Sequence, residues 1–441
     1  MTKKVLVVMS LLMLVLVSST GFSATKKTKI TWWTHQRHDM DFMQAKVAEF
    51  NKTNKDGIEI EYVIQTENYS QNLELAFQSG QAPDIFSGFN NAKYYADRNM
   101  AMPLNRYLTT DIKNRYGNFL YVETEGVVNG KIYSLSNAGV NFRLIYNLDL
   151  FKKANLPGPP KSIAEMVAYA KKITEVGKDE KAYGFAINMK NPYTALFRSM
   201  DQIAKRSGAW PYDYRTGKFT FEPMKPIILA FKQMKDDGST FPGIENLDID
   251  PMRSQFAEGK IGMYISGNWE PGVYEQQFPA KINWAAAPVP TIDGTVKGKT
   301  WVRAGRWQFI SSQSKKIKLV WKVYDWFHRD EILVPYHEGG YGYTVVPSVA
   351  KKAKDPNIKG ASYFKLDEKV DAIWPSAPHE EGLQVEGRTY YDVIAMVILG
   401  LTPVDDAIKD LNKRYNDALD KGEKAKTIRR PIIKNFDPLK L

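Results

Sequence analysis

Residues 256–269, with the sequence FAEGKIGMYISGNW, constrain the fold of this chain more than any other stretch. The stretch begins as the end of an amphipathic helix, and Gly259 follows, a residue type that often ends helices because it adopts positive φ. Residues 261–265 form a short apolar run, which is typical of a strand inside a sheet covered on both faces. Open α/β sheets bind ligands at the carboxyl ends of their strands. The stretch therefore predicts a buried strand whose final loop, with Trp269, borders a binding site.

The first 23 residues are expected to be a cleaved export signal. Lys3 and Lys4 precede an apolar run over residues 5–17, and small residues follow that run. The run has 13 residues, whereas a helix needs about 20 to span a bilayer. The chain has no cysteine, so we expect neither a disulfide framework nor a lipid-modified cysteine. These features predict a secreted protein that is not a lipoprotein.

The first part of the chain after the signal alternates between strand and helix patterns. The order is strand, helix, strand, helix, strand, which is typical of a doubly wound α/β unit. These elements are predicted over residues 29–33, 41–54, 58–64, 69–79 and 84–86. Asn129-Gly130 lies between two apolar runs and predicts a type I′ hairpin. Further helices are predicted over residues 162–174, 193–207, 226–235, 251–257, 316–327, 363–371, 390–399 and 404–420.

Several motifs, in their order and spacing, resemble the extracellular solute-binding proteins of ABC sugar importers, the group that includes maltose-binding protein. They are APDIFSG at residues 82–88, NGKIYSL at 129–135, LIYNLDLF at 144–151, the stretch 256–269, and the closing helix that follows LGLTPVDD at 399–406. The resemblance covers about residues 29–420. It implies an α/β, two-lobed periplasmic-binding-protein fold, in which each lobe is a doubly wound sheet flanked by helices.

The resemblance also implies three hinge crossings between the lobes. We expect them at residues 136–139, at the AAAPVP segment 285–290, and at the glycine-rich segment 339–343. After the signal peptide at 1–23, the N-terminal lobe would then comprise residues 24–137 with 290–339. The C-terminal lobe would comprise residues 138–289 with 340–441, and its tail from residue 427 has no counterpart in the family.

By the same resemblance, the protein is expected to be the substrate-binding component of an ABC transporter. It would capture a carbohydrate, an oligosaccharide, between its lobes and deliver it to the transmembrane subunits of a permease. We expect a periplasmic monomer with no cofactor, no bound metal and no catalytic residue.

The formal net charge of +12 bears on the choice of partner. Such a surplus favours nucleic acid, an anionic glycan or a membrane surface. The lysines are, however, spread in pairs over predicted helix exteriors, as on a soluble basic surface. With an export signal present, we expect no nucleic-acid partner, whereas an acidic oligosaccharide stays open as the ligand.

Sugar binding asks for flat apolar faces and for matched hydrogen-bonding groups around the hydroxyls. Trp32 and Trp33 point to opposite faces of the first strand, and we choose Trp33 as the ligand-side residue. Asp84 stands where the family keeps an aspartate, which either accepts sugar hydroxyls or caps the adjacent turn. The predicted ligand contacts are Trp33, His35, Asp84, Phe89, Asn90, Asn141, Trp269, Arg306, Trp307, Tyr341, Tyr343 and Trp374. For each of them, a place in the core or on the surface is the alternative.

Two other functions stay open. The first keeps the fold and changes the ligand to a small charged solute such as a polyamine, a phosphate ester or a metal chelate. His35 and His38 alone are too few for a metal site. The second is a secreted glycan-degrading enzyme, which needs two carboxyl groups facing each other across a cleft. Neighbouring acids such as Glu380 and Glu381 fit a solvated surface better, and no GxSxG, HExxH or GxGxxG motif occurs.

Overall fold

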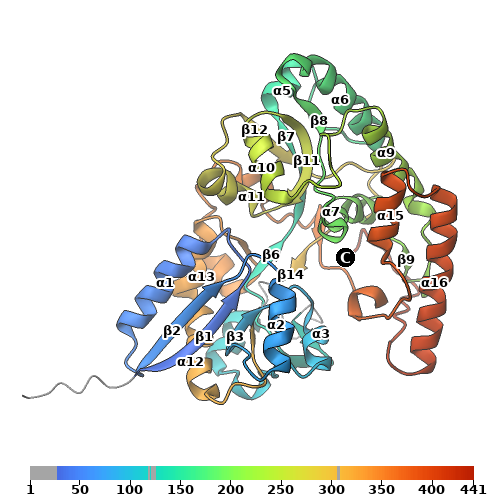
Figure 1. The fold of residues 1–441 in the computed structure, drawn as a ribbon. Coiled ribbons are helices and arrows are strands. Elements are labelled where there is room, and N and C mark those ends of the chain that lie inside the picture. Colours follow the sequence, from blue (N-terminus) through green and yellow to red (C-terminus); the bar gives the residue numbers. More distant parts are fainter. Residues whose placement is uncertain (1–26, 118–119, 121–125, 305–307) are drawn as a thin grey trace, which may run out of the picture.

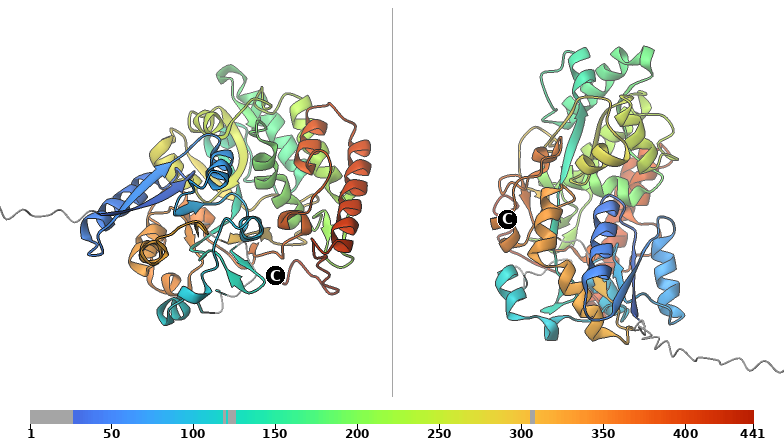
Figure 2. Two further views of the ribbon diagram at one scale, coloured as in Figure 1. Left: turned by 60° about the horizontal axis from the view of Figure 1, so that its bottom comes forward. Right: turned by 90° about the vertical axis from the view of Figure 1, so that its left-hand side faces the viewer.

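The computed structural model of the chain describes residues 27–117, 120, 126–304 and 308–441. The expected signal peptide, residues 1–23, lies outside them. Two sheets, each with helices on both faces, form two lobes that a small third sheet joins (Figure 1). In the side view of Figure 2, the blue and orange elements of the first lobe lie at one end and the green and yellow elements of the second lobe at the other.

The first lobe is built on a sheet with the strand order β15-β3-β1-β2. Strands β3, β1 and β2 are parallel, and the edge strand β15 is antiparallel to β3. The bounds are β1 Thr28–Thr34, β2 Ile58–Ile64, β3 Ile85–Ser87 and β15 Gln308–Ile310. Trp32 points to a core shared with α1 (Met40–Thr53) and α12 (Ile317–Phe327). Phe86 points to the opposite core under α2 (Tyr69–Gln78) and α3 (Ala92–Asp97). Helices on both faces confirm the doubly wound unit that the alternating pattern predicts.

The second lobe is built on a sheet with the order β12-β7-β11-β8. The strands are β7 Phe142–Asn147, β8 Tyr183–Phe185, β11 Ile261–Gly267 and β12 Trp284–Ala287. All seven residues of β11 are buried, and Gly259 has φ +81° before it. Met263 and Ile265 face one core while Ile261 and Tyr264 face the other. The prediction of an internal strand covered on both faces is confirmed.

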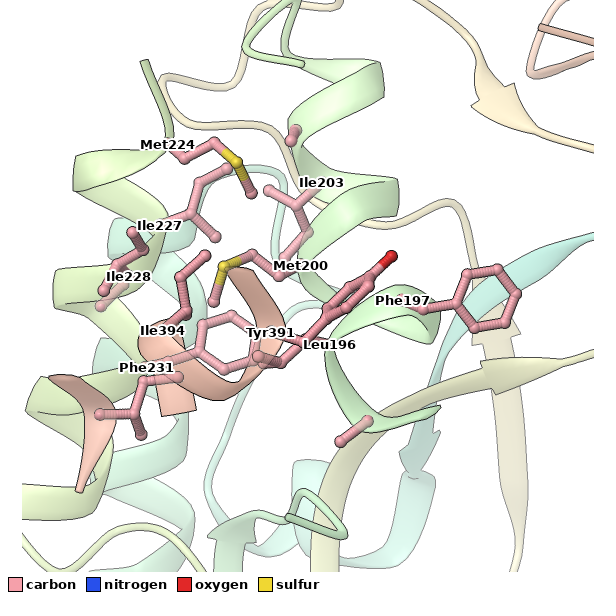
Figure 3. Close-up of a cluster of buried hydrophobic side chains, with 14 of the residues drawn as sticks. Leu196, Phe197, Met200, Ile203, Met224, Ile227, Ile228, Phe231, Tyr391 and Ile394 are labelled. Carbon is pink, nitrogen blue, oxygen red and sulfur yellow. The ribbon is translucent and has the colours of Figure 1, made fainter. Parts of the chain in front are cut away.

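The larger core of the second lobe lies among helices on one side of this sheet. Figure 3 shows aliphatic, methionine and aromatic side chains from several helices packed together there, while Phe197 points away from the others. The helices on this side are α5 Leu148–Lys153, α6 Ile163–Val176, α7 Pro192–Arg198, α8 Met200–Arg206, α9 Lys225–Asp236, α15 Tyr390–Ile398 and α16 Val404–Lys424. The other face is covered by α10 (Ile249–Ala257).

The remaining elements are short. In the first lobe they are α4 Thr110–Tyr116, the hairpin strands β4 Val127–Val128 and β5 Lys131–Ile132, α13 Asp330–Glu338 and α14 Pro347–Lys352. In the second lobe they are β9 Tyr212–Asp213, β10 Lys218–Phe219, α11 Glu270–Gly272, β13 Thr300–Trp301 and β17 Asp371–Ala372. Among the residues described, no helix is both long and apolar enough to cross a membrane.

The third sheet lies between the lobes and has the order β14-β6-β16. Its strands are β6 Ala138–Val140, β14 Arg303–Ala304 and β16 Tyr343–Thr344. Gly139 is the central residue, because it pairs with Ala304 on one side and with Tyr343 on the other. We name these three strands the hinge sheet.

Two of the expected crossings are misplaced in the prediction. Residues 285–290 do not return to the first lobe, because Ala285, Ala286 and Ala287 pair with β7 inside the second-lobe sheet; the chain crosses only at β14. After β16 the chain does not enter the second lobe, because Val349 of α14 packs in the first-lobe core. We therefore propose that the last passage lies at residues 353–360, and that the first lobe comprises residues 27–137 with 304–352.

Two predicted helices also differ in the structure. The helix expected over residues 193–207 is two helices, α7 and α8, that meet at Ser199 (φ −110°, ψ −72°). Residues 363–371 form the end of a 3-10 turn and the start of β17 instead of a helix. There the carbonyl groups of Tyr363 and Phe364 accept hydrogen bonds from Arg143 and Asn141. Asn141, between β6 and β7, and Arg143 of β7 thus hold this segment in place by hydrogen bonds.

Candidate functional site

The carboxyl ends of β1 and β3 in the first lobe and of β11 in the second lobe lie at the junction of the lobes. One chain of contacts joins them. Nη2 of Arg303, on the hinge sheet, donates to the carbonyl of Phe89 (3.3 Å), and its guanidinium lies 5.2 Å from the ring centre of Phe197. Phe197 contacts Phe142, which contacts Trp269 (5.9 Å between ring centres). We name the residues along this path, together with Arg198 and His35, the interlobe site.

Trp269 forms the second-lobe end of this site and is half-buried. Its ring lies over the end of β11, where a Cβ atom on Gly267 would come within 2.5 Å of it. Glycine is therefore required there, and the ring is fixed by that close approach. The indole Nε1 donates to Oε1 of Glu270 at 2.8 Å.

Glu270 connects Trp269 to the first lobe through a series of charged side chains. Its carboxylate is fully buried and accepts from Nε and Nη2 of Arg253 (3.0 and 2.7 Å) and from Ser266. Nη1 of Arg253 donates to Asp250 (3.1 Å), and Asp250 pairs with Arg37 of the first lobe (2.7 Å). We name this series, from Trp269 to Arg37, the Glu270 network.

Arg198 ends α7 and lies beside Trp269, with its guanidinium carbon 5.2 Å from the ring centre. Its Nε and Nη1 are covered from solvent and make no hydrogen bond to any residue that the structure describes. Burial, and after it the neighbouring Arg253, lowers the pKa of Arg198 to about 10. The group is still a cation at neutral pH, and its Nε and Nη1 have no acceptor within the ranges that the structure describes.

The first-lobe side of the site is the loops after β1 and β3. The imidazole of His35 stacks on the ring of Phe89, with 3.7 Å between their centres, and Phe89 is 39% exposed. The backbone N–H groups of Phe89 and Asn90 donate to the hydroxyl of Tyr95, which holds the loop. His35, Phe89 and Asn90 thus lie at the strand ends where the sequence places them. Trp33 is half-buried and packs on the core under α2.

Asp84 lies at the amino end of β3, away from the interlobe site. Its Oδ2 accepts from the backbone of Thr31 (3.0 Å) and from Lys316 (2.8 Å), and its Oδ1 accepts from Ser314 (2.6 Å). These bonds tie β1 to the chain that returns after β15. The carboxylate stabilises the fold, and the expected contact with ligand is corrected.

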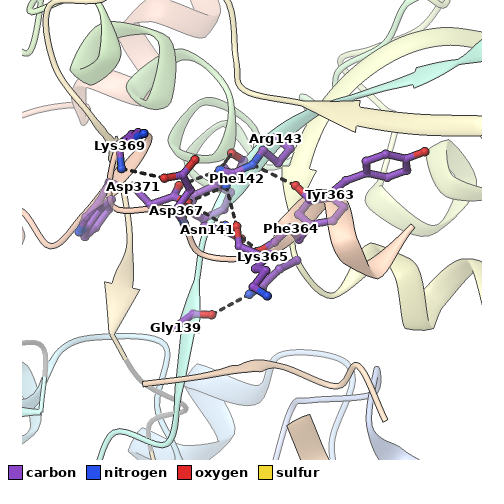
Figure 4. Close-up of polar contacts among 12 residues, drawn as sticks. Gly139, Asn141, Phe142, Arg143, Tyr363, Phe364, Lys365, Asp367, Lys369 and Asp371 are labelled. Atoms are coloured by element: carbon purple, nitrogen blue, oxygen red, sulfur yellow. Dashed lines mark hydrogen bonds and ion pairs between the residues drawn. The ribbon is translucent and has the colours of Figure 1, made fainter. Parts of the chain in front are cut away.

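Asn141 is buried at the joint between the lobes, and its Nδ2 donates to the carbonyl of Phe364 (2.9 Å). Beside it, Arg143 and Asp371 form a bidentate ion pair of 2.7 and 2.6 Å, with side chains only 3% and 2% exposed (Figure 4). Nδ2 of Asn268 donates to Gly139 of the hinge sheet (2.7 Å). Asn141 is therefore one of the buried residues that hold the joint between the lobes together.

Tyr341 and Tyr343, the two tyrosines of the glycine-rich segment, lie in different surroundings, one at the surface and one in a core. Tyr341 packs against Phe42 (5.1 Å between ring centres) and its hydroxyl accepts from Gln276 of the second lobe. Tyr343 is buried in the smaller core of the second lobe, which corrects its expected contact with ligand. Arg306 and Trp307, also predicted as ligand contacts, lie outside the described residues.

Trp374 is buried and forms part of an aromatic cage around a lysine. Nζ of Lys205 lies 3.8, 4.5 and 4.8 Å from the ring centres of Trp210, Trp301 and Trp374. The Lys205 side chain is 0% exposed, and Glu380 is 3.7 Å from its Nζ. Because the cage already holds this ammonium group, Trp374 offers no open face to a ligand, and the expected contact is corrected.

Two buried groups beside this cage predict a pH dependence of stability. Burial raises the pKa of Asp201 to about 7, against the donating hydroxyls of Tyr390 and Tyr391, and burial lowers the pKa of His379 to about 4. From about pH 4 to about pH 7, folded Asp201 holds a proton that the unfolded chain has lost, so its contribution to stability falls as the pH rises. Neutral His379 acts in the opposite direction between about pH 4 and 6.5.

The test is the variant Asp201→Asn, in which the amide stays neutral at every pH. Its melting temperature relative to that of the native protein should rise steadily when the pH is raised from about 5 to about 8. Asp213→Asn, at a surface turn, is the matched control and should show no such rise, since the pKa of Asp213 is lowered and not raised. A constant difference for Asp201→Asn would contradict the prediction.

Sequence reasoning missed four residues of the interlobe site: Phe142, Phe197, Arg198 and Arg303. Phe197 and Arg198 lie in a helical pattern that predicts an ordinary core position for the phenylalanine and an ordinary surface position for the arginine. Tyr193, one turn earlier, is 41% exposed and stacks parallel to Phe197. The spacing of two aromatic residues at i and i+4 with an arginine beside them is the only signal in the sequence, and it does not distinguish a binding face from a core.

The fold and this site define a two-lobed binding protein, in which residues of both lobes meet at the strand ends. The profile of the family described as bacterial extracellular solute-binding protein matches residues 35–332. The chain belongs to this family, which confirms the family that the motifs resemble.

Relatives agree with this assignment. A Brucella abortus (strain 2308) protein, named only as a binding protein, is 28% identical over 240 residues, which are 54% of this chain and 56% of that protein. A Brucella suis biovar 1 (strain 1330) protein gives the same values. The match thus spans about half the length of these curated relatives.

Solved structures share the whole architecture. An ABC substrate-binding protein of Listeria monocytogenes in complex with cycloalternan has a TM-score of 0.71 at 19% identity and covers 89% of this chain and 99% of its own. A solute-binding protein from Thermotoga lettingae bound with α-D-tagatose has a TM-score of 0.71 at 21% identity, and the match covers 89% of this chain and 100% of that one. The maltose/maltodextrin-binding domain from Bdellovibrio bacteriovorus bound to maltotriose has a TM-score of 0.70 at 18% identity, and the match covers 90% of this chain and 100% of that one. These likenesses confirm the two-lobed fold.

Proposed function

We propose that this protein is the substrate-binding component of an ABC importer. It acts as a periplasmic monomer after removal of residues 1–23, binds an oligosaccharide at the interlobe site and delivers it to a membrane permease. The observation that carries the proposal is the pair of aromatic surfaces on opposite lobes, Trp269 on one and the His35–Phe89 stack on the other, with Arg303 between them. Flat apolar faces of this kind suit the C–H faces of sugar rings, and the three similar structures have sugars as their bound ligands.

Ligand binding would act on the relation between the lobes. A solute that contacts both lobes favours the closed form in proportion to its higher affinity for that form. The contacts between the lobes include exposed ion pairs such as Arg37 with Asp250, whose side chains are 42% and 28% exposed. Exposed ion pairs contribute about 0–1 kcal/mol each, so a solute that contacts both lobes adds substantially to the free energy of closure. The closed lobes then present one outer surface to the permease.

A thermal-shift screen of the mature protein against neutral and acidic mono- and oligosaccharides tests the proposal, with product analysis for every sugar that binds. A higher melting temperature with the sugar recovered intact is the expected result, because ligand that binds only the native state stabilises it. A shift accompanied by cleavage of the sugar would identify a glycan-degrading enzyme instead. No shift with any sugar would reject the carbohydrate and turn the search to small charged solutes.

The variant Trp269→Ala tests the placement of the site. We expect sugar binding to weaken by about 1–3 kcal/mol, the range for a lost aromatic contact together with its buried area, as measured by calorimetric titration. Trp326→Ala is the control, because Trp326 packs beside α1 in the first lobe, far along the chain from the site. Equal affinities of Trp269→Ala and the native protein would rule out a ligand contact by this ring.

A further inference from the structure

We propose that the solute is an acidic oligosaccharide, one that carries a carboxylate or sulfate group, and that Arg198 binds this group while Trp269 and its neighbours contact the sugar rings. The inference rests on the proposed function and names the chemical class of its ligand. It starts from the guanidinium of Arg198, whose covered Nε and Nη1 meet no acceptor among the described residues.

The donors of Arg198 are placed where an acceptor is needed. Its Nε and Nη1 are covered and make no hydrogen bond within the described part of the chain, whereas the residue as a whole keeps some exposure. The ring of Trp269 lies against the guanidinium, 5.2 Å away, and its π face attracts the cation without accepting these N–H groups as a carboxylate would. Covered donors without acceptors destabilise a protein unless something else supplies the acceptor.

The nearest carboxylate of the protein does not satisfy Arg198. Glu270 already accepts from Arg253 twice, from Ser266 and from Trp269, so its oxygens are occupied. Arg253 adds a second positive charge near Arg198 and lowers its pKa. A second buried carboxylate at the joint, Asp371, is held by Arg143 in a bidentate pair. Positive charge therefore exceeds negative charge on this side of the site.

Further cations and aromatic faces surround the same place. The guanidinium of Arg303 lies 5.2 Å from Phe197 and 5.7 Å from Trp301, and it bonds the Phe89 carbonyl across the junction. Tyr193, 41% exposed, stacks parallel to Phe197 at 5.7 Å. Guanidinium groups bind carboxylate and sulfate with paired donors, and aromatic rings beside them fit a sugar. An acidic sugar matches both features, whereas a neutral sugar offers Arg198 hydroxyl oxygens but no charged acceptor that binds two donors at once.

The overall charge of the chain agrees with an anionic ligand. The formal net charge is +12, which would speed the approach of an acidic solute and would make binding weaker as salt is added. This long-range effect does not select the site. It does predict a dependence on ionic strength that a neutral sugar would not show.

Calorimetric titration of the mature protein with three probes tests the inference: maltotriose, trigalacturonate and a sulfated chondroitin disaccharide. We expect at least one acidic probe to bind at least tenfold more tightly than maltotriose, and its affinity to fall as salt is raised from about 50 to about 500 mM. Arg198→Gln should weaken the acidic probe at least tenfold and change maltotriose less than threefold. Arg198→Lys should restore part of the loss, because it keeps the charge and loses the planar donors.

The control variant is Arg215→Gln, at an exposed turn of the second lobe, which should bind all probes as the native protein does. Melting temperatures of the variants separate a binding effect from loss of the fold. If maltotriose binds most tightly, or if Arg198→Gln weakens acidic and neutral probes equally, the inference is overturned while the proposed function stands. If no sugar of either kind binds, the proposed function itself fails.

Discussion

Replacing Glu270 with alanine should lower the free energy of unfolding by about 3–5 kcal/mol, the usual loss when one partner of a buried ion pair is removed. The carboxylate is fully buried and is the acceptor for both Arg253 and the indole of Trp269. Without it, Arg253 keeps a buried charge with one remaining partner, the half-exposed Asp250. Urea unfolding of the ligand-free protein measures the change.

Two further variants show which part of the loss belongs to the charge. Glu270→Gln keeps the shape and an acceptor for Trp269 but leaves the Arg253 cation, so it should lose most of the same stability. Arg253→Met combined with Glu270→Leu removes both charges and should be much closer to the native protein. An alanine variant as stable as the native protein would show that water replaces the carboxylate and that the Glu270 network is not held by it.

The second large effect is expected at the joint of the lobes, where Asp371→Ala should also lower the free energy of unfolding by about 3–5 kcal/mol. Asp371 is the bidentate partner of Arg143, and it also accepts from the backbone N–H of Asp367. Its removal leaves a guanidinium in a site where that side chain is 3% exposed. The same urea experiment applies.

The control for this variant is Asp355→Ala, because Asp355 pairs with Lys365 on the surface, with side chains 64% and 61% exposed. That pair should contribute about 0–1 kcal/mol. If the two alanine variants lose similar stability, burial does not determine how much the pair of Arg143 and Asp371 contributes to the free energy of unfolding. The double variant Arg143→Met with Asp371→Leu should again recover most of the loss.

Short sequence patterns correctly predict two kinds of element: those whose interacting residues lie close together in the sequence, and those that are completely buried. The apolar run of β11 is buried on both faces, so every residue in it points to a core and the strand is recognisable. The hairpin at Asn129 and Gly130 is confirmed as well, since both residues adopt positive φ, 50° and 69°. The side chain of Ser162 caps α6 by accepting from the backbone of Glu165.

Errors occur where a distant residue decides the local structure. Residues 363–371 have a helical pattern, but Arg143 and Asn141, more than 200 positions earlier, bond to their carbonyl groups. The AAAPVP segment resembles a crossing, yet three of its alanines pair with β7. Asp84 precedes β3 rather than following it, and its partner Lys316 is 232 positions away. A pattern of a few neighbouring residues cannot predict contacts with residues so far away along the chain.

The site follows the same division. Trp269, His35 and Phe89 follow predicted strands, so the rule that ligands bind at carboxyl ends predicts them as site residues. Arg198 and Lys205 do not follow strands, and what separates them is their surroundings. The ammonium of Lys205 is enclosed by three tryptophans, whereas the guanidinium of Arg198 lies against one tryptophan, and its Nε and Nη1 meet no acceptor in the described part of the chain. Two basic residues seven positions apart along the chain are thus expected to have opposite relations to a ligand.

The hinge sheet has a consequence for the kinetics of the protein. Because Gly139 is paired on both sides, β6 cannot change its backbone angles without straining the ladders to β14 and β16 at once. The connections through β6 and β14 are thereby coupled, and we expect them to bend together over one barrier instead of in a succession of independent steps. A solute leaving the protein would accordingly be released in a single exponential phase, at a rate set by this small sheet as much as by the residues that touch the solute.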